Sequence, residues 1–434
     1  MTMHVALPHP DRNTNNGRRP RMAAGVGLAM FVFAAWASAA NLAEAQSWPR
    51  FRGPNGAGQS DATTIPVKWS EADYNWVVDL EGSGHSSPVV WGDRLVITTG
   101  DTQTATRRIS CRSTLDGKEL WGKSFKTQPH RLHRKNSYAS STPALDGQRA
   151  YFTWATPAEY VVVALDLDTG AEAWRVDLGG YQSAHGYGSS PIVYDDMVIV
   201  TKDHNGSSFL LALDRRTGDE VWKSPRGGGG KAAYSVPCIY TAPSGETAVI
   251  CHSTEHGISG LNPRNGEVLW SASDVFVKRC VNSPVVAAGL VFGTAGQGGN
   301  GDAVVAVRPG SEGRSAEVAY EVRKSAPYVI TPVAYQDMLF VWHDAGVVTC
   351  LGPADGKVHW RERVGGAYSG SPVRVGEFIY CISESGTVVV LKAAKEFELV
   401  AENELGERSY ATPAIADGRM YLRTETRLFS LGGE

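Results

Sequence analysis

The sequence lacks the short motifs that mark many redox and cofactor sites. Its 434 residues include six cysteines, but no two are adjacent and none are spaced as C-x-x-C or C-x-x-C-H. A dithiol redox pair and a covalently attached haem are therefore not expected. The sequence also has no Walker-type and no dinucleotide-binding glycine motif, which argues against a nucleotide site of either kind.

The chain also lacks an excess of charge of one sign. It has 42 Lys and Arg against 45 Asp and Glu, which gives a net charge of −3 at pH 7. A nucleic-acid-binding domain usually carries a clear excess of basic residues. We therefore expect no nucleic acid partner.

Long apolar runs are confined to one stretch near the start of the chain. Residues 22–40 are mostly apolar, follow three arginines within residues 18–21, and precede further small residues. This order predicts a signal peptide over residues 1–45 and export to the periplasm or cell envelope. The alternative is an uncleaved N-terminal anchor, because a stretch of this length can just span a bilayer. Such an anchor would associate the protein with the membrane.

The rest of the chain is built from an internal repeat. Between copies lie pairs of short apolar runs joined by a tight turn, such as residues 191–200, which indicate two paired strands. Each repeat is therefore predicted to be a four-stranded antiparallel meander. The most regular mark of the repeat is a glycine followed four residues later by tryptophan, at Gly117/Trp121, Gly170/Trp174, Gly218/Trp222, Gly266/Trp270 and Gly356/Trp360.

The number of repeats predicts the fold. Eight sheets around an axis form a β-propeller, so we predict an all-β, eight-bladed propeller over residues 74–434. The last repeat has only three strands, whereas residues 75–80 form a strand that no other repeat uses. Pairing the two would close the ring without free sheet edges. The repeats are counted by the proline that opens the first strand of each: Pro88, Pro143, Pro191, Pro237, Pro284, Pro332, Pro372 and Pro413.

Several other residues are given structural roles. Residues 46–73 are expected to form an extended segment that packs Trp48 and Phe51 on the propeller. Cys238 and Cys251 flank a turn symmetrically, so we expect them to face each other across a hairpin, either as a disulfide or as free thiols. The repeat tryptophans are expected to be wedged between neighbouring blades; they are Trp76, Trp121, Trp174, Trp222, Trp270 and Trp360.

The loops that lead into the first strand of each repeat carry candidate binding residues. Seven of the eight loops have a tyrosine or histidine three to five residues before the proline, and basic residues accompany them. Because these loops meet at the mouth of the central channel, we expect a funnel suited to a polar or anionic ligand. The alternative is that each tyrosine packs against the next blade, with its hydroxyl bonded to backbone. The candidates are His85, Tyr138, Tyr187, Lys231, Tyr234, Arg279, Asn282, Tyr328, Tyr368 and Tyr410.

No metal site and no catalytic residue are predicted. His252, Glu255 and His256 are close in sequence, but they lie in one hairpin turn rather than on one face of a helix. The serine pairs before the prolines recur as part of the repeat, so no single activated serine can be identified.

The signature A-x-D-x-x-T-G-x-x-x-W, as in residues 212–222, resembles the pyrroloquinoline-quinone-like (PQQ-like) propeller repeat. The resemblance covers residues 74–431 and implies the fold more than a function. The superfamily includes quinoprotein alcohol dehydrogenases and BamB, an eight-bladed scaffold without enzyme activity. Such dehydrogenases carry an adjacent cysteine pair, which is absent here. BamB is lipid-anchored through a cysteine after its signal peptide, whereas the first cysteine here is Cys111, so we do not expect a lipoprotein.

These observations favour an exported, monomeric propeller that acts as a binding or scaffolding module for an envelope protein or polymer, without a cofactor. One alternative is an oxidoreductase that uses pyrroloquinoline quinone and Ca²⁺, with Asp203 or Asp344 as base. A second is a carbohydrate-binding or carbohydrate-cleaving propeller with a tyrosine-rich mouth. Cleavage would require a pair of carboxylates at a fixed separation.

Overall fold

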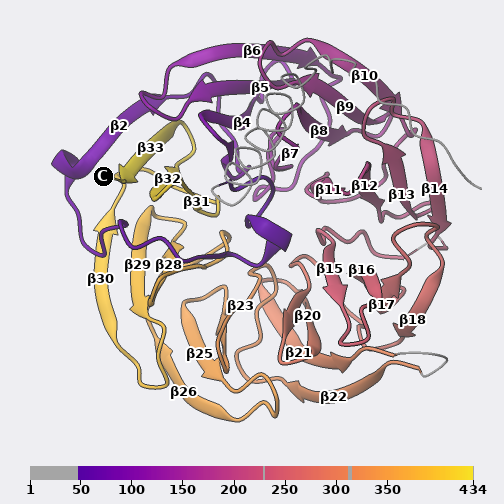
Figure 1. Ribbon diagram of the computed structural model, residues 1–434, viewed down its shortest axis with the longest axis vertical. Helices are drawn as coiled ribbons and strands as arrows, with labels where there is room; N and C mark the ends of the chain where they lie inside the picture. Colours follow the sequence, from indigo (N-terminus) through magenta and orange to yellow (C-terminus); the bar gives the residue numbers. More distant parts are fainter. Residues whose placement is uncertain (1–46, 228–229, 311–314, 434) are drawn as a thin grey trace, which may run out of the picture. The chain divides into compact units, whose positions relative to one another are not determined.

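The computed structural model describes residues 47–227, 230–310 and 315–433. The predicted signal peptide lies outside these residues. Residues Glu44–Glu434 form one compact unit, in which eight separate sheets surround a central axis (Figure 1). The prediction of an all-β, eight-bladed propeller is confirmed. No helix of the described residues is long and apolar enough to cross a membrane.

Each blade is a meander whose successive strands pair with one another. Blades 1 and 2 are β3 (Val89–Trp91), β4 (Arg94–Asp101), β5 (Thr106–Ser113), β6 (Glu119–Lys126) and β7 (Ala144–Leu145), β8 (Arg149–Ala155), β9 (Tyr160–Asp166), β10 (Glu172–Asp177). Blades 3 and 4 are β11 (Ile192–Tyr194), β12 (Met197–Lys202), β13 (Phe209–Asp214), β14 (Glu220–Pro225) and β15 (Cys238–Thr241), β16 (Thr247–Ser253), β17 (Gly257–Leu261), β18 (Val268–Ala272).

The second half of the ring repeats this arrangement. Blades 5 and 6 are β19 (Val285–Ala287), β20 (Leu290–Gln297), β21 (Asn300–Arg308), β22 (Glu317–Val322) and β23 (Val333–Tyr335), β24 (Met338–Trp342), β25 (Val347–Leu351), β26 (Val358–Arg363). Blades 7 and 8 are β27 (Val373–Val375), β28 (Phe378–Ile382), β29 (Thr387–Lys392), β30 (Leu399–Glu404) and β31 (Ala414–Ala416), β32 (Arg419–Arg423), β33 (Arg427–Gly432), β2 (Tyr74–Asp79).

The eighth blade joins the two ends of the propeller. Its outermost strand, β2, comes from the start of the propeller and pairs antiparallel with β33, from Tyr74 opposite Leu431 to Asp79 opposite Arg427. This pairing gives the last sheet its fourth strand, as the strand count of the sequence requires.

The burial of each strand follows its place in the blade. The middle strand β9 is buried at nearly every position, because both of its faces pack against neighbouring sheets. The outer strand β10 buries chiefly Trp174 and exposes the residues around it. The strands therefore differ in hydrophobic pattern although the repeat is regular.

The repeat tryptophans connect neighbouring blades. The indole N–H of Trp174 donates to the carbonyl of Arg215 in the next blade at 3.0 Å, and Trp121 donates likewise to Leu167 at 2.8 Å. Gly218, with a φ of +80°, packs so closely that a Cβ would lie 2.8 Å from the Trp174 ring. The Asp-x-x-Thr-Gly turn and the tryptophan are thus two halves of one contact between blades. Trp76, Trp222 and Trp360 make the same bond, and Trp270 is also buried.

The two cysteines predicted to face each other do not do so. In the β15–β16 hairpin Cys238 lies opposite Ile250, so Cys251 is one residue out of register. Since adjacent residues of a strand point to opposite faces, the two thiols belong to different core clusters. The prediction was wrong because counting residues outward from the turn does not give the register in which the two strands pair. All six cysteines are buried and unpaired.

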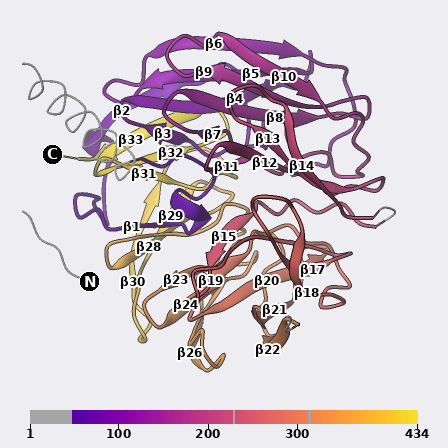
Figure 2. The same ribbon diagram turned by 45° about the vertical axis from the view of Figure 1, so that its right-hand side comes forward.

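The segment before β2 crosses the central channel. The short helix η1 (Pro54–Gly56) lies in the middle of the ring in both ribbon views (Figure 1; Figure 2). The segment bonds to Val90 of blade 1 at Trp48 and then runs to blade 7, where β1 (Gln59–Ser60) pairs parallel with β27. Beyond it, η2 (Glu71–Asp73) leads into β2. The segment therefore links blades far apart in the ring.

Candidate functional site

A ring of hydroxyl side chains surrounds the channel. It is formed by the residue before the proline of each blade. In seven of the eight neighbouring pairs, the hydroxyl of one blade accepts a hydrogen bond of 2.9–3.2 Å from the backbone N–H of the preceding blade's residue. The eighth pair is Ser190 and Val236, where the valine offers no acceptor. The ring residues are Ser87, Thr142, Ser190, Val236, Ser283, Thr331, Ser371 and Thr412.

Two buried arginines of the N-terminal segment close one end of this channel. Arg52 is fully buried and donates to the backbone carbonyls of Thr331 (3.1 Å), Pro372 (3.0 Å) and Pro332 (2.8 Å). Arg50 donates to the carbonyl of Pro237 at 2.5 Å. Burial lowers the pKa of Arg52 to about 9 and that of Arg50 to about 10. These bonds hold the segment to the blades.

The opposite end of the channel opens into a cavity of about 900 Å³. The eight ring residues and Phe51 line it together with loops that enter the first strands and loops that join the second and third strands. Such a volume is in the upper range of small-molecule sites, about 300–1,000 Å³. The cavity is the candidate functional site.

Six of the ten predicted funnel residues line this cavity: His85, Lys231, Tyr234, Arg279, Tyr328 and Tyr410. The Tyr234 hydroxyl is 2.7 Å from that of Ser183, and the His85 and Tyr410 rings lie 4.3 Å apart between centroids. The structure thus brings residues of five different blade junctions to one surface.

The other four predicted residues do not line the cavity: Tyr138, Tyr187, Asn282 and Tyr368 are all buried. The Tyr187 hydroxyl bonds to those of Tyr160 and Thr153, at 2.9 and 3.0 Å. Tyr138 bonds to the backbone of His130, and Tyr368 packs on Trp342. Their placement in the funnel was wrong because the spacing to the proline does not show which way each side chain points.

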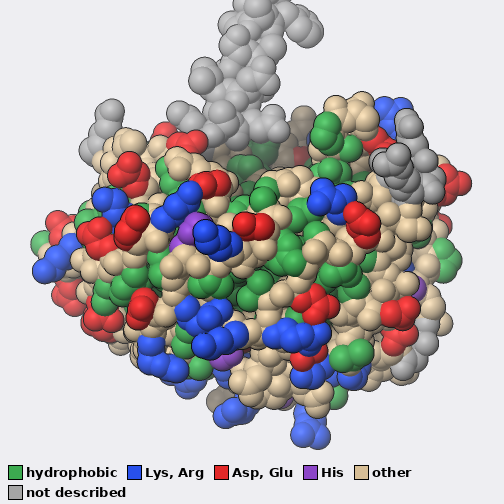
Figure 3. Space-filling model, turned by 90° about the horizontal axis from the view of Figure 1, so that it is seen from below, with side chains coloured by type: hydrophobic (Ala, Val, Ile, Leu, Met, Phe, Trp, Pro, Cys, Tyr) green, Lys and Arg blue, Asp and Glu red, His purple; other side chains and the backbone are tan. Residues whose placement is uncertain are grey.

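The cavity wall is rich in cationic and imidazole groups. Arg279 Nη1 lies 3.3 Å from His185 Nε2 and 3.4 Å from the Tyr328 hydroxyl. The rings of His133 and His185 lie 4.9 Å apart, and Arg134 and Lys135 follow on the same loop. Figure 3 shows that Lys and Arg side chains gather toward the lower edge of that view. Basic residues are therefore unevenly distributed although the net charge is small.

The histidines of the wall are held in their neutral forms. Burial, with the charges of Arg423 and Arg408, lowers the pKa of His85 to about 4. Burial and the neighbouring Arg279 lower the pKa of His185, and burial with Arg134 and Lys135 lowers that of His133. Protonation is disfavoured because each ring lies near fixed positive charge.

The carboxylates near the cavity are already bonded. Asp344, the one carboxylate among the lining residues that the structure describes, accepts the backbone N–H groups of Tyr328 and Val329 at 2.7 and 3.0 Å. Burial raises its pKa. Glu384, beside the mouth, accepts from Lys135 Nζ at 2.6 Å and from Ser369 at 2.7 Å.

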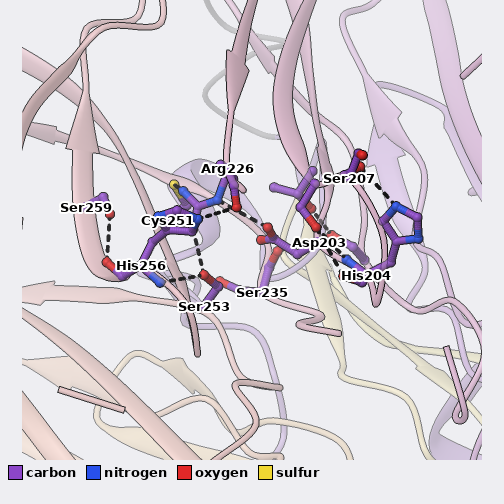
Figure 4. Close-up of polar contacts among 12 residues, drawn as sticks. Asp203, His204, Ser207, Arg226, Ser235, Cys251, Ser253, His256 and Ser259 are labelled. Carbon is purple, nitrogen blue, oxygen red and sulfur yellow. Dashed lines mark hydrogen bonds and ion pairs between the residues drawn. The ribbon is translucent and has the colours of Figure 1, made fainter. Parts of the chain in front are cut away.

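Asp203, the other carboxylate considered as a base, does not line the cavity. It is buried, and its Oδ1 lies 3.2 Å from Arg226 Nε. Arg226 also donates to Cys251 Sγ and Ser253 Oγ, both at 2.9 Å (Figure 4). His256 contacts the Arg226 carbonyl. These residues form a buried structural cluster.

The cavity does not fit a calcium-bound quinone. Calcium takes six to eight oxygen ligands, usually several carboxylates, whereas Asp344 is already occupied by backbone N–H groups. Within residues 47–227, 230–310 and 315–433, no group of three or more His, Cys, Asp or Glu could hold a metal ion.

Three residues that line the site were not predicted as site residues from the sequence. His133 and His185 come from long loops outside the repeat pattern, and Phe51 comes from a segment before the first blade. The hydroxyl ring could have been found, because Ser or Thr precedes the proline in seven of the eight repeats.

Together these features define an eight-bladed propeller of PQQ-like repeats with a cavity at one end of its channel. The family model described as outer membrane protein assembly factor BamB matches residues 105–327, 304–396 and 344–431. The chain belongs to this family. A relative in Yersinia pestis, named outer membrane protein assembly factor BamB, is 23% identical over 295 residues, which is 65% of this chain and 70% of that protein.

Solved structures agree on the fold. BamB from Moraxella catarrhalis superposes with a TM-score of 0.59 at 15% identity, over 82% of this chain and 96% of that one. Quinohemoprotein alcohol dehydrogenase from Comamonas testosteroni superposes with a TM-score of 0.64 at 14% identity, over 91% and 82%. The similarity spans BamB and an alcohol dehydrogenase, so it shows the fold and not the function.

Proposed function

We propose that this chain is a binding module of the cell envelope that carries out no chemistry itself. The observation that carries this proposal is the state of its candidate catalytic groups. Asp203 is paired with Arg226, and both oxygens of Asp344 accept backbone N–H groups. The side chains left facing the cavity are cations, imidazoles, phenols and hydroxyls, which suit recognition of a ligand, and no carboxylate among the described lining residues is left unbonded.

The family supports an envelope partner. The relative in Yersinia pestis is named as an outer membrane protein assembly factor. By analogy, we propose that this chain is exported, works as a monomer without a cofactor, and engages an envelope protein. The mouth of the cavity is the proposed contact surface, since it carries Arg134 and Lys231, two exposed cations that form no ion pair among the described residues. Surface cations of this kind speed and orient association with an acidic partner.

The test compares two faces of the ring. The tagged full chain is crosslinked in its native envelope, and bound proteins are identified by mass. Arg134→Glu with Lys231→Glu reverses two charges at the mouth. Arg216→Glu with Arg264→Glu reverses two exposed charges on turns of the opposite face. We expect the mouth variant to lose an envelope protein that the wild type and the control retain.

A dye-reduction assay with pyrroloquinoline quinone, Ca²⁺ and simple alcohols accompanies this test. We expect no turnover. Turnover, or an unchanged set of bound envelope proteins in the mouth variant, would overturn the proposal.

A further inference from the structure

The base of the cavity presents hydrogen-bond donors. In the circle of seven bonds, each ring hydroxyl oxygen accepts a hydrogen bond from a backbone N–H. A hydroxyl has one hydrogen of its own besides its acceptor lone pairs. The ring hydroxyls line the cavity, so each can turn its remaining O–H toward a ligand.

The wall above the ring presents further donors. Arg279 forms no ion pair among the described residues, and its Nε is buried without a hydrogen-bond partner. The same holds for Nδ1 of His185, whose Nε2 lies 3.3 Å from Arg279. A neutral His185 accepts from Arg279 at Nε2 and carries its own proton on Nδ1. The N–H groups at Arg279 Nε and His185 Nδ1 therefore lack an acceptor, which a bound anion would supply.

Lys135 lines the same cavity, but its ammonium is paired with a carboxylate of the protein. Its ammonium is neutralised by Glu384, which also accepts from Ser369. Arg279, Arg134 and Lys231 also line the cavity and form no ion pair within the described part of the chain. The difference indicates that the second group of cations is left for something outside the chain.

The shape of the cavity limits the size of the occupant. Phe51 and the buried arginines of the N-terminal segment close its floor, so a chain cannot thread through the channel. Its volume of about 900 Å³ has room for a small organic molecule. The rings of Tyr234, His85 and Tyr410 lie on the wall, the last two tilted by 37° to each other, and their apolar faces suit the faces of a sugar ring.

We propose that the cavity binds a small acidic sugar, with its carboxylate or phosphate beside Arg279 and its hydroxyl groups toward the ring of Ser and Thr. The proposal deepens the proposed binding function by naming the ligand class of its cavity. It does not require that the envelope partner bind at the same time.

The experiment is isothermal titration calorimetry of the full chain with glucuronate, glucose 6-phosphate and glucose. We expect at least one acidic sugar to bind one to one, at least tenfold more tightly than glucose. Which of the two binds distinguishes a carboxylate site from a phosphate site. Arg279→Gln should weaken binding at least tenfold, and Arg279→Lys should restore part of it. Arg216→Gln, which removes an exposed charge on the opposite face, should bind as the wild type does.

The inference would be overturned if neither acidic sugar bound, if glucose bound equally well, or if Arg279→Gln bound as the wild type does while its melting temperature was unchanged. These outcomes are separate from those of the crosslinking test. Loss of the envelope protein in the mouth variant without sugar binding would retain the proposed function and reject the ligand. Sugar binding without a protein partner that depends on the mouth would retain the ligand and reject the proposed function.

Discussion

The two ends of the central channel use the same residue type for opposite purposes. At the closed end, Arg52 is fully buried and its guanidinium donates to carbonyls of blades 6 and 7. At the open end, Arg279 is half-buried and its Nε has no partner. Both arginines lie near the channel axis. What separates these two arginines is that Arg52 donates to backbone carbonyls from all three of its nitrogens, whereas Arg279 has an unpartnered Nε on the cavity wall.

The cost of each arrangement differs in the same way. Removing a buried charge from water is unfavourable, and burial accordingly lowers the pKa of Arg52 to about 9. The carbonyls at the channel end repay this cost with short, charge-assisted hydrogen bonds. The cations at the mouth keep contact with water and need no such compensation. The closed end should therefore determine stability, and the open end should determine binding.

The largest expected effect on stability comes from replacing the buried arginine at the closed end. Arg52→Met would leave the carbonyls of Thr331, Pro332 and Pro372 without their donor. We expect a loss of about 4 kcal/mol in the free energy of unfolding, because several charge-assisted bonds disappear at a buried site. Denaturation in urea measures the effect.

Arg279→Gln is the matched variant at the mouth, and its unfolding free energy should change by less than about 0.5 kcal/mol. Equal losses of unfolding free energy in the two variants would show that the arginines at both ends of the channel contribute to stability in the same way.

Acid provides a second contrast, between an interior histidine and those at the mouth. Burial and the charge of Arg226 lower the pKa of His252 to about 3. The unfolded chain, with an ordinary pKa near 6.5, then binds the proton more readily than the folded one. Stability is therefore complete above pH 6.5 and falls as the pH drops toward 3. We expect a loss of roughly 3 kcal/mol from this group between pH 6.5 and 4, measured by urea denaturation as a function of pH.

His252→Leu should flatten this part of the pH profile, whereas His133→Gln at the exposed mouth should not. Acid should act differently at the mouth, where protonation of His133 and His185 adds positive charge beside Arg279, Arg134 and Lys135. There the affinity for glucuronate, whose carboxylate stays ionised over this range, should rise as the pH falls from 7 to 5.5. A weaker affinity at the lower pH would contradict the assignment of this wall as the anion contact.

The repeat made the ring predictable, whereas the segment across it was not. The eight prolines set the number of blades, and the three-stranded last repeat identified residues 75–80 as its missing strand, because each blade needs four strands. The path of residues 47–60 depends on carbonyls of blades 4, 6 and 7, which no local pattern reveals. The sequence indicated no role for Arg50 and Arg52, yet both are buried.

The site was predictable only as a location. Loops of the right kind were identified, but a tyrosine three to five residues before the proline can point into the cavity, as Tyr234 does, or between blades, as Tyr187 does. The choice depends on which neighbouring hydroxyls are available, and Tyr187 finds those of Tyr160 and Thr153. In the same way, the register between β15 and β16 determines which face of the sheet Cys238 and Cys251 each occupy.

These two tyrosines provide the third test. Tyr187→Phe should lower the unfolding free energy by about 1–2 kcal/mol, because two buried hydroxyls lose a partner. Tyr234→Phe removes one hydroxyl contact, with Ser183, at the edge of the cavity, and should change stability by less than about 0.5 kcal/mol. Urea denaturation of the two variants under identical conditions measures both. A larger loss in Tyr234→Phe would mean that the mouth tyrosine is also a packing residue.

The smallest expected effect comes from the one break in the hydroxyl ring. Val236 follows Ser190 in the circle. Its side chain offers no acceptor to the backbone N–H of Ser190. Thr has nearly the shape of Val but carries a hydroxyl, so Val236→Thr would complete the circle by the same bond that joins the other seven pairs. A net hydrogen bond is worth about 1 kcal/mol, and the substituted hydroxyl must give up its own hydration. We therefore expect a gain of about 0.5 kcal/mol in unfolding free energy, whereas Val236→Ala, which removes the methyl groups without adding an acceptor, should lose stability. A loss in both variants would mean that the apolar surface of Val236 against its neighbours matters more than closure, and that the ring is held by its seven bonds alone.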